Sequence, residues 1–395
     1  MTRSAVAAAP QPYIIFGKPA IGEPDIEEVL DTLRSAWLGT GPKVKTFEHQ
    51  FAEYVGARHA VATNSCTAAL HLALSALEIG PGDEVIVPTL TFCATANVVV
   101  HTGARPVLVD VDPKTQCVTV EAIAAALTPL TKAIVPVHFA GWPAPMREVR
   151  ALADAHGLKI VQDAAHCIEG RIDGGPPSRF GDVTCYSFYA TKNVVTGEGG
   201  MAVTDDAALA ERMRVLGLHG IDADAWQRFS AAGYKHYQCI VPGFKYNMMD
   251  LQAALGIHQL ARVEENLRTR EGQWQRYQSA LHNLPLELPA IVPLSVRHAR
   301  HLYTVRVRPE APLSRDELLQ ALHSEGIGSG VHYVPVHAHA YYRERFGYTD
   351  ASFPIAATVG QTTCSLPLGP GLQDAQQARV IAALHQILAT PPRHV

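Results

Sequence analysis

The 395-residue sequence lacks several features that mark common protein classes. Its 33 basic residues do not outnumber its 37 acidic residues, so composition gives no reason to expect a nucleic acid or an anionic membrane surface as partner. It has no run of about 18 apolar residues, so no membrane-spanning helix is expected. The 7 cysteines form no CxxC pair. Such scattered cysteines favour reduced thiols in a cytoplasmic protein over a disulfide framework.

Several sequence signatures of enzymes are also missing. No GxGxxG motif follows a predicted strand and opens a helix, so the fingerprint of a nicotinamide-dependent oxidoreductase is absent. GxxxxGK[ST], HExxH and GxSxG motifs are absent as well. His332, His337 and His339 lie close together, but their spacing does not match the usual metal signatures. We therefore expect no metal site.

Short apolar runs alternate with helical patterns over the first half of the chain, and 47% of all residues are hydrophobic. Helix-period segments, such as residues 67–78 and 146–157, separate most of these runs. Strands that alternate with helices predict an α/β fold with a mostly parallel sheet, whose ligands bind at the carboxyl ends of the strands. The predicted strands are residues 59–63, 84–88, 106–110, 132–137, 159–164, 182–188 and 200–204.

The second half of the chain has a different pattern. Residues 218–246 are aromatic, contain glycine and show no regular period, which is typical of a long ordered loop. A long helix is predicted over about 249–276, followed beyond Pro285 by strand, helix, strand and a final helix near 374–388. The predicted organisation is a flexible N-terminal tail (1–16), a large domain (17–255) and a smaller C-terminal α+β domain (256–395).

Lysine is scarce, and one of the nine lysines has an unusual setting. Most of the others lie in polar or loop contexts, where a solvated surface role is expected. Lys192 instead follows the strand 182–188 closely, lies between Thr191 and Asn193, and precedes a group of glycines. A lysine at the carboxyl edge of a sheet has the position that a Schiff-base lysine needs.

Two further candidate residues lie at and just after the end of the strand 159–164. Asp163 ends an otherwise apolar run, where a carboxylate is costly unless it is paired. It is either a helix N-cap or a carboxylate that faces a cationic ring nitrogen, as pyridoxal phosphate requires. His166, three residues later, either orients the same ring or has a structural role.

A helix N-terminus and an aromatic residue complete the candidate set. Asn64, Ser65 and Thr67 follow the strand 59–63 and start a helix, which creates either an anion site or an ordinary N-cap. Phe92 follows the strand 84–88. Its ring either stacks on a flat cofactor or packs in the core.

Taken together, these segments resemble the nucleotide-sugar aminotransferases of the DegT–DnrJ–StrS group. The resemblance runs from about Gly17 to Leu388, in the family's order and spacing. It implies the pyridoxal phosphate-dependent transferase fold of type I, with a mostly parallel seven-stranded sheet in the large domain and a smaller C-terminal α+β domain. The matching stretches include WLGTGPK, NSCTAALHLAL, IVQDAAHCIEG, CYSFYATKNVVTGEGG, GFKYNMMDLQAALG, VHYVPVH and CSLPLGPGL.

The resemblance also implies a role for each candidate residue. Lys192 would hold pyridoxal phosphate as a Schiff base and then move the proton, and Asp163 would keep the pyridine nitrogen protonated. His166 would contact the ring, and Phe92 would stack on it. Asn247 would reach the cofactor of a neighbouring subunit, which implies a homodimer with a shared active site. The implied phosphate-binding residues are Ser65, Cys66, Thr67 and Ser187; Cys66 stands where relatives often have Gly.

The implied reaction moves an amino group from L-glutamate, through pyridoxamine phosphate, to a keto sugar. WLGTGPK and the Trp-containing loop resemble the branch that acts on nucleotide-linked 4-keto-6-deoxy sugars. Arg228, Lys235 and His332 are candidate contacts for the nucleotide, because a diphosphate needs cationic donors. A 3-keto sugar or keto-cyclitol aminotransferase and a non-catalytic regulatory protein that binds pyridoxal phosphate are the alternatives.

Overall fold

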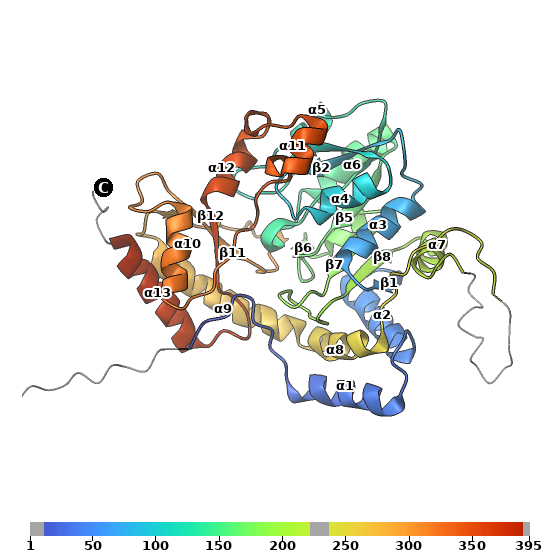
Figure 1. Ribbon diagram of the computed structural model, residues 1–395, viewed down its shortest axis with the longest axis horizontal. Coiled ribbons are helices and arrows are strands. Elements are labelled where there is room, and N and C mark those ends of the chain that lie inside the picture. The colour runs from blue at the N-terminus through green and yellow to red at the C-terminus, as the bar shows by residue number, and fades with distance from the viewer. Residues whose placement is uncertain (1–11, 222–236, 390–395) are drawn as a thin grey trace, which may run out of the picture.

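A central sheet of seven strands dominates the computed structural model, which describes residues 12–221 and 237–389 (Figure 1). The strand order is β1-β8-β7-β5-β4-β2-β3. Only β8 among these strands runs antiparallel to its neighbours. The predicted α/β fold with a mostly parallel sheet is therefore confirmed. The strands are β1 (His59–Thr63), β2 (Glu84–Pro88), β3 (Arg105–Val109), β4 (Thr131–Ile134), β5 (Lys159–Asp163), β7 (Val183–Ser187) and β8 (Gly200–Thr204).

Helices cover both faces of this sheet. On one face, α3 (Cys66–Ala76) packs across β1, β7 and β8, and its Leu70, Leu72 and Leu74 are fully buried. On the other face, Phe47 and Phe51 of α2 pack against Tyr186 and Phe188. Burial on both faces explains why the strands read as continuous apolar runs rather than alternating ones. The remaining helices around the sheet are α1 (Glu23–Ser35), α2 (Pro42–Val55), α4 (Ala94–His101), α5 (Val120–Ala125), α6 (Met146–His156), α7 (Ala207–Gly217) and α8 (Asp250–Ala261).

A second core forms around a three-stranded antiparallel sheet of order β12-β11-β9. Three aromatic residues lie at its centre. The ring centroid of Tyr303 is 4.8 Å from that of Trp274 and 4.9 Å from that of Tyr277. A short pair, β6 (Arg171–Ile172) with β10 (Val296–Arg297), joins this half to the segment after β5. The elements are α9 (Val263–Leu281), β9 (Leu286–Glu287), β11 (Tyr303–Val307), α10 (Arg315–Ser324), α11 (Ala340–Phe346), α12 (Pro354–Thr362), β12 (Thr363–Leu366) and α13 (Asp374–Ala389).

The helix predicted over 249–276 is two helices, α8 and α9, which follow each other across the lower part of Figure 1, above α1. The break is at Arg262, whose backbone has φ −106° and ψ 10°. Its guanidinium donates to the buried carboxylate of Asp25 and to the carbonyl of Ala20. Apolar periodicity continues across the break, so the sequence pattern did not reveal it. The predicted domain boundary after residue 255 lies inside α8.

Part of the predicted N-terminal tail is packed. Ile14 is buried, and its backbone N–H and C=O pair with Gly326 and Gly328. The Phe16 ring stacks on His332 with 5.5 Å between ring centroids. Residues 1–11 of the tail lie outside the described residues. No helix in the described ranges is both long and apolar enough to cross a bilayer.

A carboxylate at the start of α8 caps the N-terminus of α2. Asp250 at the start of α8 is buried and accepts hydrogen bonds from three backbone N–H groups, those of Gly41 (2.8 Å), Val44 (3.0 Å) and Lys43 (3.2 Å). These groups lie at the N-terminus of α2, where helix geometry leaves donors without partners and the dipole favours negative charge. Asp250 therefore caps α2 from a distant part of the sequence.

We expect Asp250→Asn to lower the free energy of unfolding by about 2 kcal/mol, because charged acceptors form the stronger hydrogen bonds and the amide supplies only one oxygen. Urea unfolding measures this loss. Asp206→Asn is the matched control: Asp206 is the exposed N-cap of α7, and Asn caps helices about as well there. Equal losses in the two variants would contradict the role given to Asp250.

Candidate active site

The candidate residues gather at the carboxyl edge of the central sheet. Asp163 is the last residue of β5, Ser187 is the last residue of β7, and Lys192 lies in the connection from β7 to β8. Neighbouring parallel strands bring these ends together.

Asp163 is a buried carboxylate with an incomplete set of partners. Its Oδ2 accepts from the hydroxyl of Thr95 (2.8 Å) and its Oδ1 accepts from the backbone N–H of Ala165 (3.1 Å). Burial raises its pKa, while these two hydrogen bonds and the charge of Lys192 act in the opposite direction. Among the described residues, no Arg or Lys forms an ion pair with it. The site is thus prepared to receive a positive charge at this carboxylate.

Lys192 has the electrostatic setting of a reactive amine. Desolvation lowers its pKa to about 8, against the opposing effect of Asp163. At pH 7 a lysine with this pKa is about 10% deprotonated, whereas an ordinary lysine is deprotonated to less than about 0.1%. The neutral amine is the nucleophilic form, so Lys192 is primed to attack a carbonyl carbon.

His166 and Tyr333 form a hydrogen-bonded pair whose proton positions follow from their surroundings. The backbone N–H of Ala140 donates to His166 Nδ1 (3.3 Å), so Nδ1 is an acceptor. Burial, followed by the charge of Lys192, lowers the pKa of His166 well below its ordinary value. A neutral ring with an accepting Nδ1 carries its proton on Nε2, which then donates to the Tyr333 hydroxyl (3.0 Å). The Tyr333 O–H is left to donate to another group.

Sequence reasoning missed Tyr333. The segment VHYVPVH was considered for its histidines, and the aromatic residue between them carried no separate signal. His332, proposed as a nucleotide contact, instead bonds to Ser365 Oγ (2.8 Å). Desolvation lowers its pKa to about 4, so it is neutral near pH 7 and is not the cationic donor that was expected. Arg228 and Lys235 lie outside the described residues.

The N-terminus of α3 lies where the anion site is predicted, and it has the free donors that such a site needs. Ser65 is the N-cap, and its Oγ accepts from the N–H of Ala68 (3.1 Å). Helix geometry leaves the N–H groups of Cys66 and Thr67 without an intrahelical acceptor. Burial raises the pKa of the Cys66 thiol well above its ordinary value, so this side chain brings no negative charge to the site.

Gly200 on β8 allows this helix end to approach the sheet, and sequence reasoning gave it no role. Its backbone pairs with Thr63 on one side and with Ser187 on the other. A Cβ atom added at Gly200 would lie 2.4 Å from the carbonyl carbon of Ser65 and 2.5 Å from the nitrogen of Cys66. Only glycine, which has no Cβ, lets β8 lie this close to the N-terminus of α3.

Phe92 and Asn247 lie at the rim. Phe92 is 56% exposed, so core packing is not its role, and its ring lies 5.8 Å from that of Tyr333. The backbone of Asn247 pairs with Thr63 at the end of β1, and its side-chain amide donates to Thr40 Oγ1 (2.7 Å). Both residues are therefore placed beside the carboxyl edge of the sheet.

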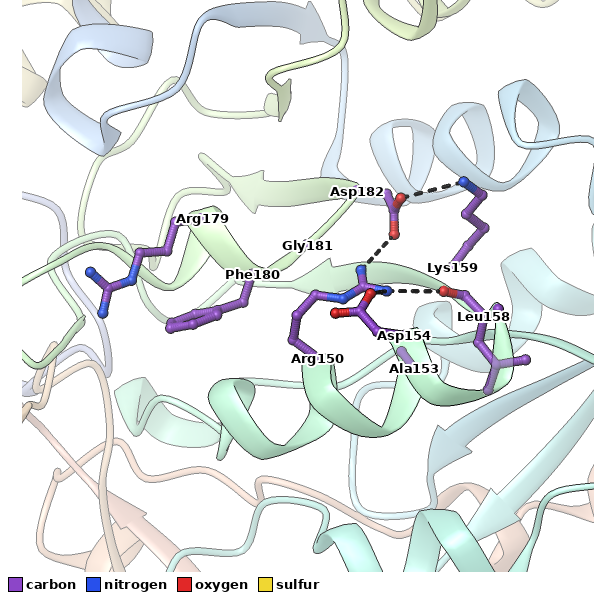
Figure 2. A pocket seen from close by; sticks show the side chains of 10 residues that line it. Arg150, Ala153, Asp154, Leu158, Lys159, Arg179, Phe180, Gly181 and Asp182 are labelled. Atoms are coloured by element: carbon purple, nitrogen blue, oxygen red, sulfur yellow. Dashed lines mark hydrogen bonds and ion pairs between the residues drawn. The ribbon is translucent and has the colours of Figure 1, made fainter.

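A separate hollow of about 460 Å³ lies at the opposite, amino edge of the sheet (Figure 2). Four of its charged groups pair with one another: Arg150 with Asp182 and Asp154, and Lys159 with Asp182. The guanidinium of Arg179 donates to the Ile172 carbonyl instead. None of the candidate catalytic residues lines this hollow.

Comparison with known proteins gives a consistent result. Residues 19–385 match the family described as DegT/DnrJ/EryC1/StrS aminotransferases. The spore coat polysaccharide biosynthesis protein SpsC of Bacillus subtilis (strain 168) is 48% identical over 378 residues, which are 95% of this chain and 97% of that protein.

Solved structures agree with this match. The putative sugar aminotransferase Spr1654 from Streptococcus pneumoniae, in its PLP form, superimposes with a TM-score of 0.87 at 33% identity and covers 95% of this chain and 99% of its own. Its PMP form has also been solved. S. venezuelae DesV superimposes with a TM-score of 0.83 at 36% identity over 92% of this chain and 93% of its own.

We expect Gly200→Ala to weaken the binding of pyridoxal phosphate about tenfold or more, because the added methyl group pushes Ser65 and Cys66 out of the anion site. Spectroscopic titration of the apoprotein measures the dissociation constant. Gly272→Ala is the matched control, since a Cβ there meets nothing within 4 Å and Gly272 lies inside α9. An unchanged dissociation constant for Gly200→Ala would refute this account of the anion site.

Proposed function

Because the chain belongs to the DegT/DnrJ/EryC1/StrS aminotransferase family, and so is a pyridoxal phosphate-dependent sugar aminotransferase, we propose that it moves an amino group from L-glutamate to a nucleotide-linked 4-keto-6-deoxy sugar. The observation that carries the proposal for the site is that Lys192 and Asp163 lie close enough for each to shift the pKa of the other. The amine is primed, and the buried carboxylate forms no ion pair with a Lys or Arg side chain within the described residues.

The residues present fit the cofactor at each of its chemical features. The N-terminus of α3, with Ser65, Thr67 and Ser187, would hold the phosphate. Asp163 would face the ring nitrogen, and the exposed ring of Phe92 would cover the flat face. When bound, pyridoxal phosphate supplies an electron sink that stabilises negative charge at the carbon bearing the transferred amino group.

The protein's own groups hold and move the protons. The Asp163 carboxylate would keep a proton on the ring nitrogen, because a buried negative charge favours a cation beside it. Lys192 Nζ would take the proton from the donor's carbon and return it at a neighbouring carbon, since its pKa of about 8 lets it exchange protons near neutral pH. His166 would orient the Tyr333 hydroxyl, whose free O–H is a donor to ligand oxygen.

Two observations support the proposed sugar acceptor. Trp37 Nε1 donates to the Thr40 carbonyl (3.1 Å), and the Thr40 hydroxyl binds Asn247, so the WLGTGPK segment borders the site. The relative SpsC is a spore coat polysaccharide biosynthesis protein. Sugars enter such polymers as activated nucleotide derivatives, which supports a nucleotide-linked acceptor here.

The proposal includes a homodimer in which Asn247 reaches the partner's cofactor. Apolar side chains near Asn247 support it: Trp37, Leu38 and Met249 are each more than 40% exposed. Adjacent exposed apolar residues mark interaction surfaces. A cytoplasmic location also remains a proposal, supported by the seven cysteines, all of which are unpaired.

We expect the purified protein to show a visible absorption band that L-glutamate bleaches, and a panel of nucleotide-linked keto sugars to identify the acceptor that restores it. Borohydride should fix the cofactor covalently onto Lys192 in the wild type and not in Lys192→Ala, because only the lysine amine supplies the linking nitrogen. Lys245→Ala is the control for loss of a lysine. A protein that stays colourless with added pyridoxal phosphate would contradict the assignment of the site.

We expect Asp163→Asn to reduce kcat for the glutamate half-reaction by about 100-fold or more, since an amide does not keep a proton on the ring nitrogen. Stopped-flow absorbance measures this step. Asp110→Asn is the control, because Asp110 accepts only the backbone N–H groups at the start of α12 and its own neighbour. Retention of most of the rate in Asp163→Asn would exclude the role given to this carboxylate.

A further inference from the structure

A buried chain of hydrogen bonds reaches the candidate site from the second core. It starts at Arg270 on α9, which forms an ion pair with Glu169; the two side chains are 2% and 0% exposed. Glu169 Oε2 accepts from Asn193 Nδ2 (2.7 Å). Both carboxylate oxygens are thus occupied, as a buried ion pair requires. This series of hydrogen bonds reaches Asn193, the residue that follows Lys192 in the sequence.

The orientation of the Asn193 amide follows from its neighbours. Its NH₂ group donates to Glu169 Oε2 and to the Ala299 carbonyl (3.1 Å), which uses both hydrogens. The reverse orientation would place the amide oxygen against two other acceptors. Asn193 Oδ1 therefore accepts, and its partner is His301 Nδ1 (2.9 Å).

His301 must then carry its proton on Nδ1. Burial lowers the pKa of His301 well below its ordinary value, so the ring is neutral. Nearby basic side chains lower it further: those of Lys192, His332, Arg270 and His298. A neutral ring with Nδ1–H has a bare lone pair on Nε2. The Arg270–Glu169–Asn193 chain thus selects one tautomer of a histidine beside the site.

The same histidine also holds His166. The two rings lie 4.4 Å apart between centroids with an interplanar angle of 31°. The backbone N–H of His301 donates to the Ala140 carbonyl (3.2 Å), and the N–H of Ala140 donates to His166 Nδ1. His301 therefore contacts both the neighbour of Lys192 and the ring of His166.

We propose that His301 is a positioning residue of this site, which acts through its Nδ1–H bond to Asn193 and its tilted ring contact with His166. It keeps the Lys192 segment closed to water and holds His166 in the orientation that serves Tyr333. The proposal rests on the proposed function of Lys192, but its test does not depend on turnover.

The test measures the amine of Lys192 in the apoprotein. Labelling with an amine-reactive reagent over a pH series, with mass spectrometry of the Lys192 peptide, gives the midpoint at which this amine becomes reactive. Reactivity rises as the amine loses its proton, so the wild-type midpoint is expected at about pH 8 rather than near 10.5. Desolvation lowers this midpoint, and the charge of Asp163 acts in the opposite direction.

Two variants separate the ring from the hydrogen bond. His301→Phe keeps an aromatic ring but removes the donor to Asn193, so water should enter and raise the Lys192 midpoint by about one pH unit. His301→Asn places an amide N–H near the position of Nδ1–H and should show less than half of that shift. His298→Phe is the matched control: His298 is equally buried on the same segment but accepts from Arg300 N–H and has no bond to Asn193. It should leave the midpoint unchanged.

Asn193→Ala cuts the same hydrogen bond from its other end and carries the test if His301→Phe does not fold. Combined with His301→Phe in a folded double variant, it should raise the midpoint no further than either change alone. An unmoved midpoint in His301→Phe and Asn193→Ala, or an equal shift in His298→Phe, would overturn the proposal. Wild-type protein that borohydride does not link to its cofactor would instead overturn the proposed function, so the two failures are distinguishable.

Discussion

The buried charge of Asp163 is the constraint on which the rest of the site depends. A carboxylate at the end of a central strand loses its hydration, and within the described residues it accepts hydrogen bonds from only one hydroxyl and one backbone N–H. The surrounding histidines do not provide the missing charge, because burial and the nearby lysine keep His166, His301 and His332 neutral. The site is thus arranged as one half of an ion pair, which a bound ligand with a cationic ring nitrogen would complete.

Much of the architecture follows from local sequence patterns. All seven predicted strands belong to the central sheet, because a strand buried on both faces needs a continuous apolar run. The positions of Asp163 and Lys192 after such runs were also readable, since the end of a parallel strand is where a ligand binds. Ser65 was readable as an N-cap for the same local reason. Their roles in catalysis remain predictions that the geometry supports.

The parts that sequence reasoning missed depend on contacts between distant segments. Asp250 caps a helix more than 200 residues earlier in the chain, and no local pattern records this. Gly200 is needed because the N-terminus of α3 packs against it, and a glycine in the sequence does not indicate which segment will pack there. Tyr333 and His301 come from the second half of the chain and meet His166 only in the folded protein. His332 was read as a cation, although burial makes it neutral.

Because His166 is contacted by His301 and Tyr333, the parts of the site are synthesised at different times. The seven strands of the large sheet are complete once Thr204 has left the ribosome, but the two residues that pack against His166 emerge about 100 residues or more later. A nascent chain can therefore build the sheet before it can close the site. The contacts of His301 and Tyr333 with His166 therefore form only in a chain whose synthesis is nearly finished.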